Sequence, residues 1–356
     1  MSNILINSPK EKNEIEELLN KSLPNYRQAY SDRTSWLMAC ISELAYVRFN
    51  PMFKSTTKEY LIGKVSELVG DSKMKSITGL IEMVGYDAEA EKKKLEKNVE
   101  FLNLKLVKTF DNNGTQAILL ENDKYIFLGF RGTEATSIKD IKSDAKAVIK
   151  VCETGGKIHS GFDDAFNQVH LEISETLRDD KYKDKPLFIT GHSLGGALAT
   201  VAAKKLKHTG GIAACYTFGS PRVGDVVWTT NIKPPIYRLV NAADPVTMLP
   251  PGVEIIGFIA WLCGLIPHFG KTIKKFLLSK FHGYLHTGDM RYLTNCKAGG
   301  YGDVKLLYAV SWWFRIRAFF KKKISFLKIP ADHSITVYRN KLKVIASNMN
   351  DKTKNT

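Results

Sequence analysis

Hydrophobic and polar residues follow a helical period in the first part of the chain. Apolar residues recur at helical spacing over residues 31–49, and Pro51 ends that pattern. Residues 55–98 also favour helix, and they end in a charged run, residues 89–97, that is typical of a solvent-exposed face. We therefore expect residues 1–100 to form a helical region packed on the rest of the protein.

Short apolar runs separated by turn residues replace this pattern further along the chain. Runs at residues 101–110, 116–120 and 125–130 are separated by turns rich in Asn, Asp and Gly, which predicts an antiparallel meander. Beyond them, strand-like and helical stretches alternate, as in doubly wound sheets. The predicted elements of this part are residues 186–190, 194–207, 212–218, 236–240 and 335–346.

These elements predict an α/β fold with a mostly parallel central sheet and helices on both faces. The chain has no internal repeat and no low-complexity linker. The economical interpretation is therefore one domain over residues 101–347. It includes an insertion at residues 253–330 and is followed by a polar tail at residues 348–356.

The segment Gly191-His192-Ser193-Leu194-Gly195 lies directly between a predicted strand and an alanine-rich helix. A G-x-S-x-G sequence in that context is typical of the nucleophile elbow of the α/β-hydrolase fold. Gly191 and Gly195 are expected there because a Cβ would collide with the neighbouring strand and helix. The positive end of the helix faces the serine. We predict Ser193 as the nucleophile.

A serine hydroxyl needs a base, and the base needs an orienting carboxylate. In this fold the acid and then the histidine follow the serine along the chain. Asp244 lies just beyond the strand at residues 236–240, at the carboxyl edge of the sheet, where such sites are built. Asp225 precedes a helix start and is interpreted as a helix cap instead.

Two histidines compete for the role of the base. His333 lies directly before the last predicted helix, in a position from which its ring can reach the nucleophile. His286 lies in a strand-like segment, residues 284–289, and a locally bonded polar strand residue is the simpler interpretation. His192 is expected to be structural. We therefore favour His333 and keep His286 as the alternative.

The developing negative charge of the reaction needs hydrogen-bond donors. One donor should be the backbone N–H of Leu194, the residue after the nucleophile. The second should come from the loop after an early strand, and Thr133 follows the strand that ends in Phe130-Arg131-Gly132. Leu194 and Thr133 are the predicted oxyanion hole.

Six motifs now occur in the order typical of one family, the fungal-type, or class three, lipases of the α/β-hydrolase superfamily, which the chain resembles over residues 101–347. They are residues 130–133, 159–162, 191–197, 216–225, 241–246 and 249–251. The resemblance implies a Ser193–Asp244–His333 triad, an oxyanion hole at Thr133 and Leu194, and a lid at residues 134–147. It also implies that no metal or organic cofactor is needed.

Composition narrows the remaining choices. Five cysteines without a CxxC pair disfavour a zinc or thioredoxin-type site. The N-terminal residues 1–21 lack an apolar h-region, and the longest uncharged apolar run, residues 255–266, falls short of the roughly 18 residues of a spanning helix. We expect a cytoplasmic protein, or one exported without a classical signal peptide.

The net charge of +16 suggests an anionic partner. Residues 253–330 hold thirteen basic and three acidic residues, a net charge of +10, beside aromatic clusters. That mixture suits peripheral contact with an anionic lipid surface. A buried or oligomeric apolar face with solvated lysines is the alternative, and no nucleic-acid module accompanies the charge. The candidate membrane contacts are Trp261, Trp312, Trp313, Lys321, Lys322 and Lys323.

Three functions share these residues. The favoured one is a serine hydrolase of membrane or storage glycerolipids, either a phospholipase A or an acylglycerol lipase, with the charge favouring phospholipid. A soluble carboxylesterase and a non-catalytic membrane- or partner-binding protein are the alternatives. A lipase without a signal peptide could also be a delivered toxin with an immunity or inhibitor protein as its partner.

Overall fold

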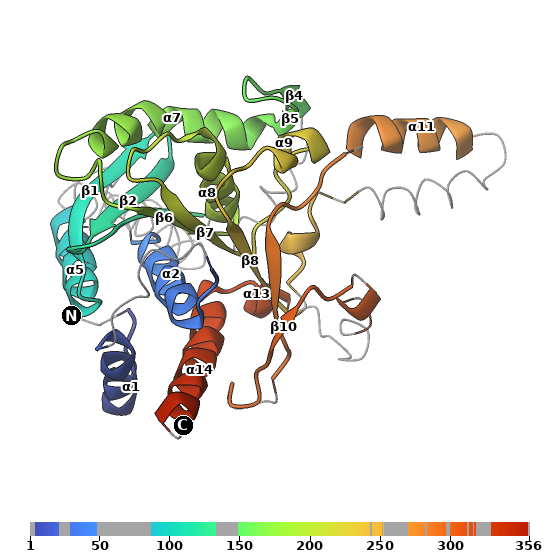
Figure 1. Cartoon of the computed structure of the whole chain (residues 1–356). Coiled ribbons are helices and arrows are strands. Elements are labelled where there is room, and N and C mark those ends of the chain that lie inside the picture. The colour runs from blue at the N-terminus through green and yellow to red at the C-terminus, as the bar shows by residue number, and fades with distance from the viewer. Residues whose placement is uncertain are drawn as a thin grey trace, which may run out of the picture.

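The computed structural model describes residues 4–20, 29–47, 87–132, 149–242, 244–250, 252, 270–281, 283–296, 300–311, 313–315, 317 and 329–354. Within these ranges, eight strands form one sheet in the order β1-β2-β3-β6-β7-β8-β9-β10 (Figure 1). Their bounds are β1 (Lys105–Asn112), β2 (Thr115–Glu121), β3 (Ile126–Phe130), β6 (Leu187–His192), β7 (Ile212–Phe218), β8 (Ile236–Asn241), β9 (Asp289–Leu293) and β10 (Leu306–Tyr308). A separate ribbon pairs β4 (Ile149–Val151) with β5 (Lys157–His159).

Strand directions divide the sheet into a meander and a parallel centre. β1, β2 and β3 pair antiparallel, as the turn residues predict. From β3 through β6, β7 and β8 to β9 every pairing is parallel, and β10 returns antiparallel to β9. The mostly parallel sheet is confirmed. β1 begins only at Lys105, because helix α5 (Ala88–Phe101) occupies the preceding residues.

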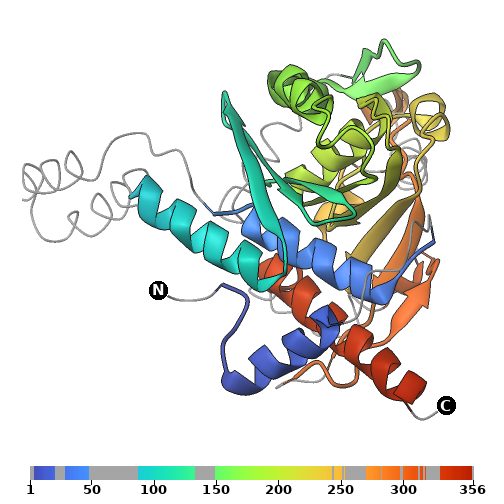
Figure 2. The same ribbon diagram turned by 60° about the vertical axis from the view of Figure 1, so that its left-hand side comes forward.

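Helices cover both faces of this sheet. α1 (Pro9–Leu19), α2 (Asp32–Leu44), α5 and α14 (Ile335–Lys354) lie on one face, and α7 (Ser160–Leu177) and α8 (Leu194–Lys205) lie on the other (Figures 1 and 2). Because side chains alternate along a strand, β2 contributes to both cores. Its Ile118 and Leu120 join the first core, and Ala117 and Leu119 join the second.

The first of these helical layers comes largely from residues 1–100. α2 begins after the N-cap Ser31, whose side chain accepts a hydrogen bond from the Thr34 N–H at 3.3 Å. Its Glu43 forms an ion pair with Arg339 of α14, and α1 contacts α14 through an ion pair of 3.0 Å between Glu11 and Lys343. The N-terminal helices therefore pack against the last helix of the chain.

Two regions differ from the sequence prediction. Residues 253–330 were expected to be an insertion, but they supply β9 and β10. These two strands belong to the central sheet. α14 continues to Lys354, so the first residues of the expected polar tail are helical. The helix continues because residues 335–354 contain no Gly or Pro to end it. Short helices α9 (Val226–Thr230), η2 (Val246–Met248), α11 (Gly270–Phe281) and α13 (Ile329–Asp332) complete the described elements.

Candidate active site

Ser193 is the single residue between β6 and α8. Its φ of 57° and ψ of −126° are strained for a residue with a side chain. The serine is 1% exposed and stands at the N-cap of α8. This is the sharp turn predicted for a nucleophile elbow.

Backbone atoms fill the space around the two predicted elbow glycines. A Cβ on Gly191 would overlap the backbone of Gly195, in the first turn of α8. A Cβ on Gly195 would overlap the carbonyl of Phe130, at the end of β3. Backbone cannot move aside as a flexible side chain can, so both positions exclude any larger residue.

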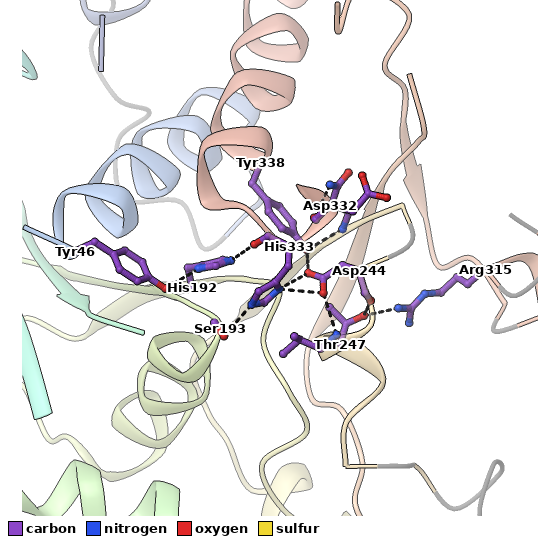
Figure 3. A network of polar contacts seen from close by, with 11 residues as sticks. Tyr46, His192, Ser193, Asp244, Thr247, Arg315, Asp332, His333 and Tyr338 are labelled. Carbon is purple, nitrogen blue, oxygen red and sulfur yellow. Dashed lines mark hydrogen bonds and ion pairs between the residues drawn. The ribbon is translucent and has the colours of Figure 1, made fainter. Parts of the chain in front are cut away.

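The structure brings the three predicted triad residues together (Figure 3). His333 Nε2 lies 2.9 Å from Ser193 Oγ. On the other side of the ring, His333 Nδ1 lies 3.0 and 2.9 Å from the two carboxylate oxygens of Asp244. His333 stands between α13 and α14, directly before the last helix as predicted. The ring is thus placed to accept a proton from the serine while the carboxylate orients it.

The carboxylate of Asp244 is fully buried and held by further donors. The Val246 N–H donates to Oδ1 at 3.0 Å, and the Tyr338 hydroxyl donates to Oδ2 at 2.6 Å. Burial, and then the charge of Asp244, hold the pKa of Tyr338 well above its usual value, so its hydroxyl stays a donor. The same hydroxyl accepts the Asn241 N–H at 2.9 Å.

Gly219 backs the triad from the end of β7. Its φ is +59°, and a Cβ there would lie 2.7 Å from Asp244 Oδ2 and 3.0 Å from the ring of His333. The glycine of the motif at residues 216–225 is therefore required by the close packing of acid and base.

The backbone of His333 is fixed by a second histidine. His192 Nε2 donates to the His333 carbonyl oxygen at 2.5 Å, and its Nδ1 accepts the Tyr46 hydroxyl at 2.8 Å. Burial, reinforced by nearby His333, holds the pKa of His192 well below its usual value, so the ring is neutral. His192 is therefore structural, as expected, although sequence reasoning did not foresee the contact with His333.

The competing candidates take other roles. His286 Nε2 bonds the Thr247 carbonyl oxygen at 2.7 Å, while His333 occupies the position next to Ser193, so the alternative of His286 as the base is wrong. His286 also precedes β9, because Gly288 with a φ of +84° interrupts the extended backbone expected there. Asp225 caps α9 by accepting the Trp228 N–H at 2.8 Å, as predicted.

The predicted oxyanion hole is described on one side only. Leu194 is the first residue of α8, and its N–H has no acceptor among the described residues. Thr133 and the expected lid, residues 134–147, lie outside the described residues. Gly132, the last residue described before them, packs so tightly that a Cβ would overlap Tyr46 and the His192 carbonyl.

The membrane-contact candidates are largely outside the described ranges. Trp261, Trp312, Lys321, Lys322 and Lys323 are not among the described residues, whereas Trp313 is described and is 58% exposed. In the same region, Lys271, Lys274 and Lys275 of α11 are exposed. None of the described helices combines the length and apolarity needed to cross a membrane.

Sequence reasoning missed Tyr46, Tyr338 and Asn241. Asn241 Nδ2 donates to the Asp332 carbonyl oxygen at 2.7 Å and so anchors the residue before His333. The only signal for Tyr338 was its position five residues after His333, which places it on an inner turn of the last helix. Tyr46 carried no signal, because it lies far from the site in sequence.

Comparisons with known proteins find lipases along part of the chain. A family model described as lipase (class 3) matches residues 127–254. The chain is 34% identical to a lipase of Rhizomucor miehei over 173 residues, which cover 44% of this chain and 47% of that relative. It is 39% identical over 110 residues to secreted mono- and diacylglycerol lipase 1 of Fusarium solani, covering 29% of this chain and 33% of that relative. The chain thus matches less than half the length of these curated relatives.

Among solved structures, the native Rhizomucor miehei lipase propeptide complex aligns with a TM-score of 0.44 and 24% identity, covering 72% of this chain and 73% of that one. The family-model match spans β3, the elbow and the acid loop, but it ends before the segment that carries His333. By its motifs and this match, the part of the chain at residues 127–254 belongs to the class 3, or fungal-type, lipase family of the α/β-hydrolase superfamily.

Proposed function

We propose that this protein hydrolyses carboxylic ester bonds of glycerolipids, and acylglycerols in the first place, through an acyl-enzyme on Ser193. The observation that carries the proposal is the continuous hydrogen-bonded line from Ser193 Oγ through the ring of His333 to Asp244. The strained elbow supports it further, since strain of that kind clusters at functional sites.

Each residue has a defined part in the reaction. Ser193 Oγ attacks the ester carbonyl while His333 Nε2 takes its proton, and the carboxylate of Asp244 stabilises the imidazolium. His333 then returns the proton to the departing alcohol, which leaves an acyl ester on Ser193. A water molecule deprotonated by His333 cleaves this ester and releases the fatty acid. The Leu194 N–H is placed to donate to the oxyanion in both steps.

Acylglycerol as the substrate rests on the relatives. The matched proteins are named as lipases and as a mono- and diacylglycerol lipase. A triad alone serves many esters, so the substrate class comes from this similarity.

Phospholipid is a second candidate substrate, favoured by charge. Lys271, Lys274 and Lys275 are exposed on α11, which projects away from the sheet (Figure 1). Trp313 and Phe314 are 58% and 47% exposed. Cations and rings in this combination suit a bilayer with anionic headgroups, and each cation near such a surface contributes about 1 kcal/mol. We propose that this region holds the enzyme on anionic lipid.

Fatty-acid release from vesicles that mix phosphatidylglycerol, phosphatidylcholine and triacylglycerol tests the proposed activity. Ser193→Ala should lower the rate by about 10⁴-fold or more while the protein stays folded. The class of lipid that disappears identifies the substrate. Release from none of these lipids, with Ser193 still labelled by a fluorophosphonate, would move the substrate to soluble esters. If the fluorophosphonate also failed to label Ser193, the proposal that the protein is a serine hydrolase would be overturned.

Charge reversal tests the membrane contact separately from the chemistry. The triple change of Lys271, Lys274 and Lys275 to Glu should reduce binding to phosphatidylglycerol vesicles by more than tenfold at low salt and leave hydrolysis of a dissolved short-chain ester unchanged. The same triple change at Lys92, Lys93 and Lys97, which are exposed on α5, is the matched control. Equal binding of the triple variant and the wild type would contradict the proposed contact.

A further inference from the structure

A cationic cluster of Arg238, Arg222 and Arg315 lies next to the loop that carries Asp244. Figure 3 shows its member Arg315 on the side of Asp244 away from Ser193. Its central member is Arg238 of β8. Because Tyr237 and Leu239 join the core beneath α2 and α14, the alternation of the strand directs Arg238 to the opposite face. Arg238 is only 7% exposed, and its Nε and one terminal nitrogen are buried without a hydrogen-bond partner.

The other members border the loop that carries the catalytic acid. Arg222 donates to the carbonyl oxygens of Met248 at 2.6 Å and Pro250 at 2.7 Å. Arg315 is 4% exposed and donates to the Thr247 hydroxyl, which in turn donates to the Asp244 carbonyl oxygen at 2.9 Å. Its Nε is buried without a partner. The cluster therefore adjoins the acid loop through direct hydrogen bonds.

The charge of Arg238, the central member, is not balanced within the described residues. Burial, and then the positive charges of Arg315 and Arg222, lower the pKa of Arg238 to about 9. No carboxylate of the described residues acts on Arg238. Asp244 acts on Arg315, but its oxygens already accept hydrogen bonds from His333, Tyr338 and Val246. An unpaired buried guanidinium is costly, so a group that supplies the missing charge would bind favourably.

A neutral donor completes the arrangement. Thr217 of β7 is the direct neighbour of Arg238 in the parallel register, and it points to the same face. Its hydroxyl oxygen is buried and has no hydrogen-bond partner. A guanidinium fork beside a free hydroxyl matches the several acceptor oxygens of a tetrahedral oxyanion.

We propose that Arg238, Arg315 and Thr217 form a binding site for a phosphate-type oxyanion, either free or as the phosphodiester of a lipid headgroup. The bound oxyanion accepts hydrogen bonds from Arg238, Arg315 and Thr217 and supplies the missing negative charge. Through Arg315 and Thr247 it also stabilises the position of the Asp244 loop. The site is separate from the triad and does not depend on the hydrolytic function.

Thermal unfolding at constant ionic strength tests the site with inorganic phosphate as the probe. The wild-type Tm should rise by several degrees as phosphate replaces chloride up to about 10 mM. Arg238→Met should lose most of this rise and, in phosphate-free buffer, be at least as stable as the wild type, because it removes an unpaired buried charge. Arg178→Met, at an exposed arginine after α7, should keep the full response.

A second arm separates the two sources of the oxyanion. In the Ser193→Ala background, monomeric dihexanoyl-phosphatidylglycerol is compared with dihexanoylglycerol. A Tm rise with the phospholipid but not with inorganic phosphate assigns the site to a headgroup, and a rise with inorganic phosphate assigns it to the free anion.

The proposal is overturned if neither raises the Tm, or if Arg238→Met destabilises the protein in every buffer, as it would if a carboxylate of the chain balanced the charge. If that variant does not fold, calorimetric titration of the wild type decides, and no saturable phosphate binding also overturns the proposal.

Discussion

Tyr338 is the side chain through which the last helix reaches the catalytic acid. Its hydroxyl donates to Asp244 Oδ2 at 2.6 Å and accepts the Asn241 N–H at 2.9 Å. The Tyr338 hydroxyl holds the carboxylate in position, and both it and His333 donate hydrogen bonds to the charged Oδ2 of Asp244. Tyr338 thus acts as a positioning residue, because it touches the triad and not the substrate.

Tyr338→Phe should lower kcat by about tenfold with little change in KM, because a hydrogen bond to a charged group contributes about 1.5–3 kcal/mol. With one donor fewer, the carboxylate keeps more negative charge for the imidazolium. The acid limb of the pH profile of kcat/KM should therefore move to higher pH. Tyr292→Phe is the matched control, since its buried hydroxyl bonds the Ala242 carbonyl at 3.3 Å. An unchanged pH profile in Tyr338→Phe would reduce its role to packing.

At the scale of elements, the join between β6 and α8 depends on backbone contact. Gly191→Ala should destabilise the protein by about 3 kcal/mol or more, because its methyl group would meet the backbone of α8 rather than a movable side chain. Gly300→Ala, where a Cβ meets nothing within 4 Å, is the control and should change stability by less than about 0.5 kcal/mol. Urea unfolding measures both. Equal stabilities would contradict the close contact at the elbow.

The N-terminal helices support the site through the pairing of α2 with α14. Arg339 is fully buried and pairs with Glu43 of α2, and it also donates to the Leu5 carbonyl at 3.0 Å. Glu43→Gln should cost about 3 kcal/mol, because it removes the close carboxylate of a buried guanidinium and leaves the longer ion pair with Glu11, at 3.8 Å. Glu16→Gln, in an exposed pair with Lys12, should cost less than about 0.5 kcal/mol. A small effect of Glu43→Gln in urea unfolding would show that the layer is not held by this pair.

At the scale of the whole molecule, the sequence predicts what depends on local pattern. Ser193 and Asp244 each follow a strand that is visible as a short apolar run, and His333 directly precedes a visible helix. These three residues could therefore be named from the sequence. The contacts of Tyr46 with His192 and of Arg339 with Glu43 join residues more than a hundred positions apart. No local pattern encodes such pairings. A strand was predicted at residues 284–289, just before the observed β9, because the sequence does not show the break at Gly288. The strand β10 was missed, since a short edge strand inside a basic region gives a weak signal.

Two histidines with lowered pKa values, the buried His192 and the half-buried His286, make the stability of the whole molecule depend on pH. Burial, and then His333, hold the pKa of His192 well below its ordinary value, and burial with the charges of Arg238 and Arg222 does the same for His286. Both rings are neutral in the folded protein but bind a proton in the unfolded chain below about pH 6.5. The unfolded state therefore binds more protons there, so stability is constant above that pH and falls as the pH decreases below it.

Each of these histidines should contribute a loss approaching 1.4 kcal/mol per pH unit once the pH is well below 6.5. Urea unfolding at pH 7.5, 6.5 and 5.5 measures the wild-type loss, and His286→Gln should lose less over the same range because one of the two rings is gone. His286 bonds the Thr247 carbonyl beside the acid loop. Below pH 6.5, activity should therefore decline together with stability in the wild type. Stability that stays level from pH 7.5 to 5.5 would contradict the neutral state of both rings.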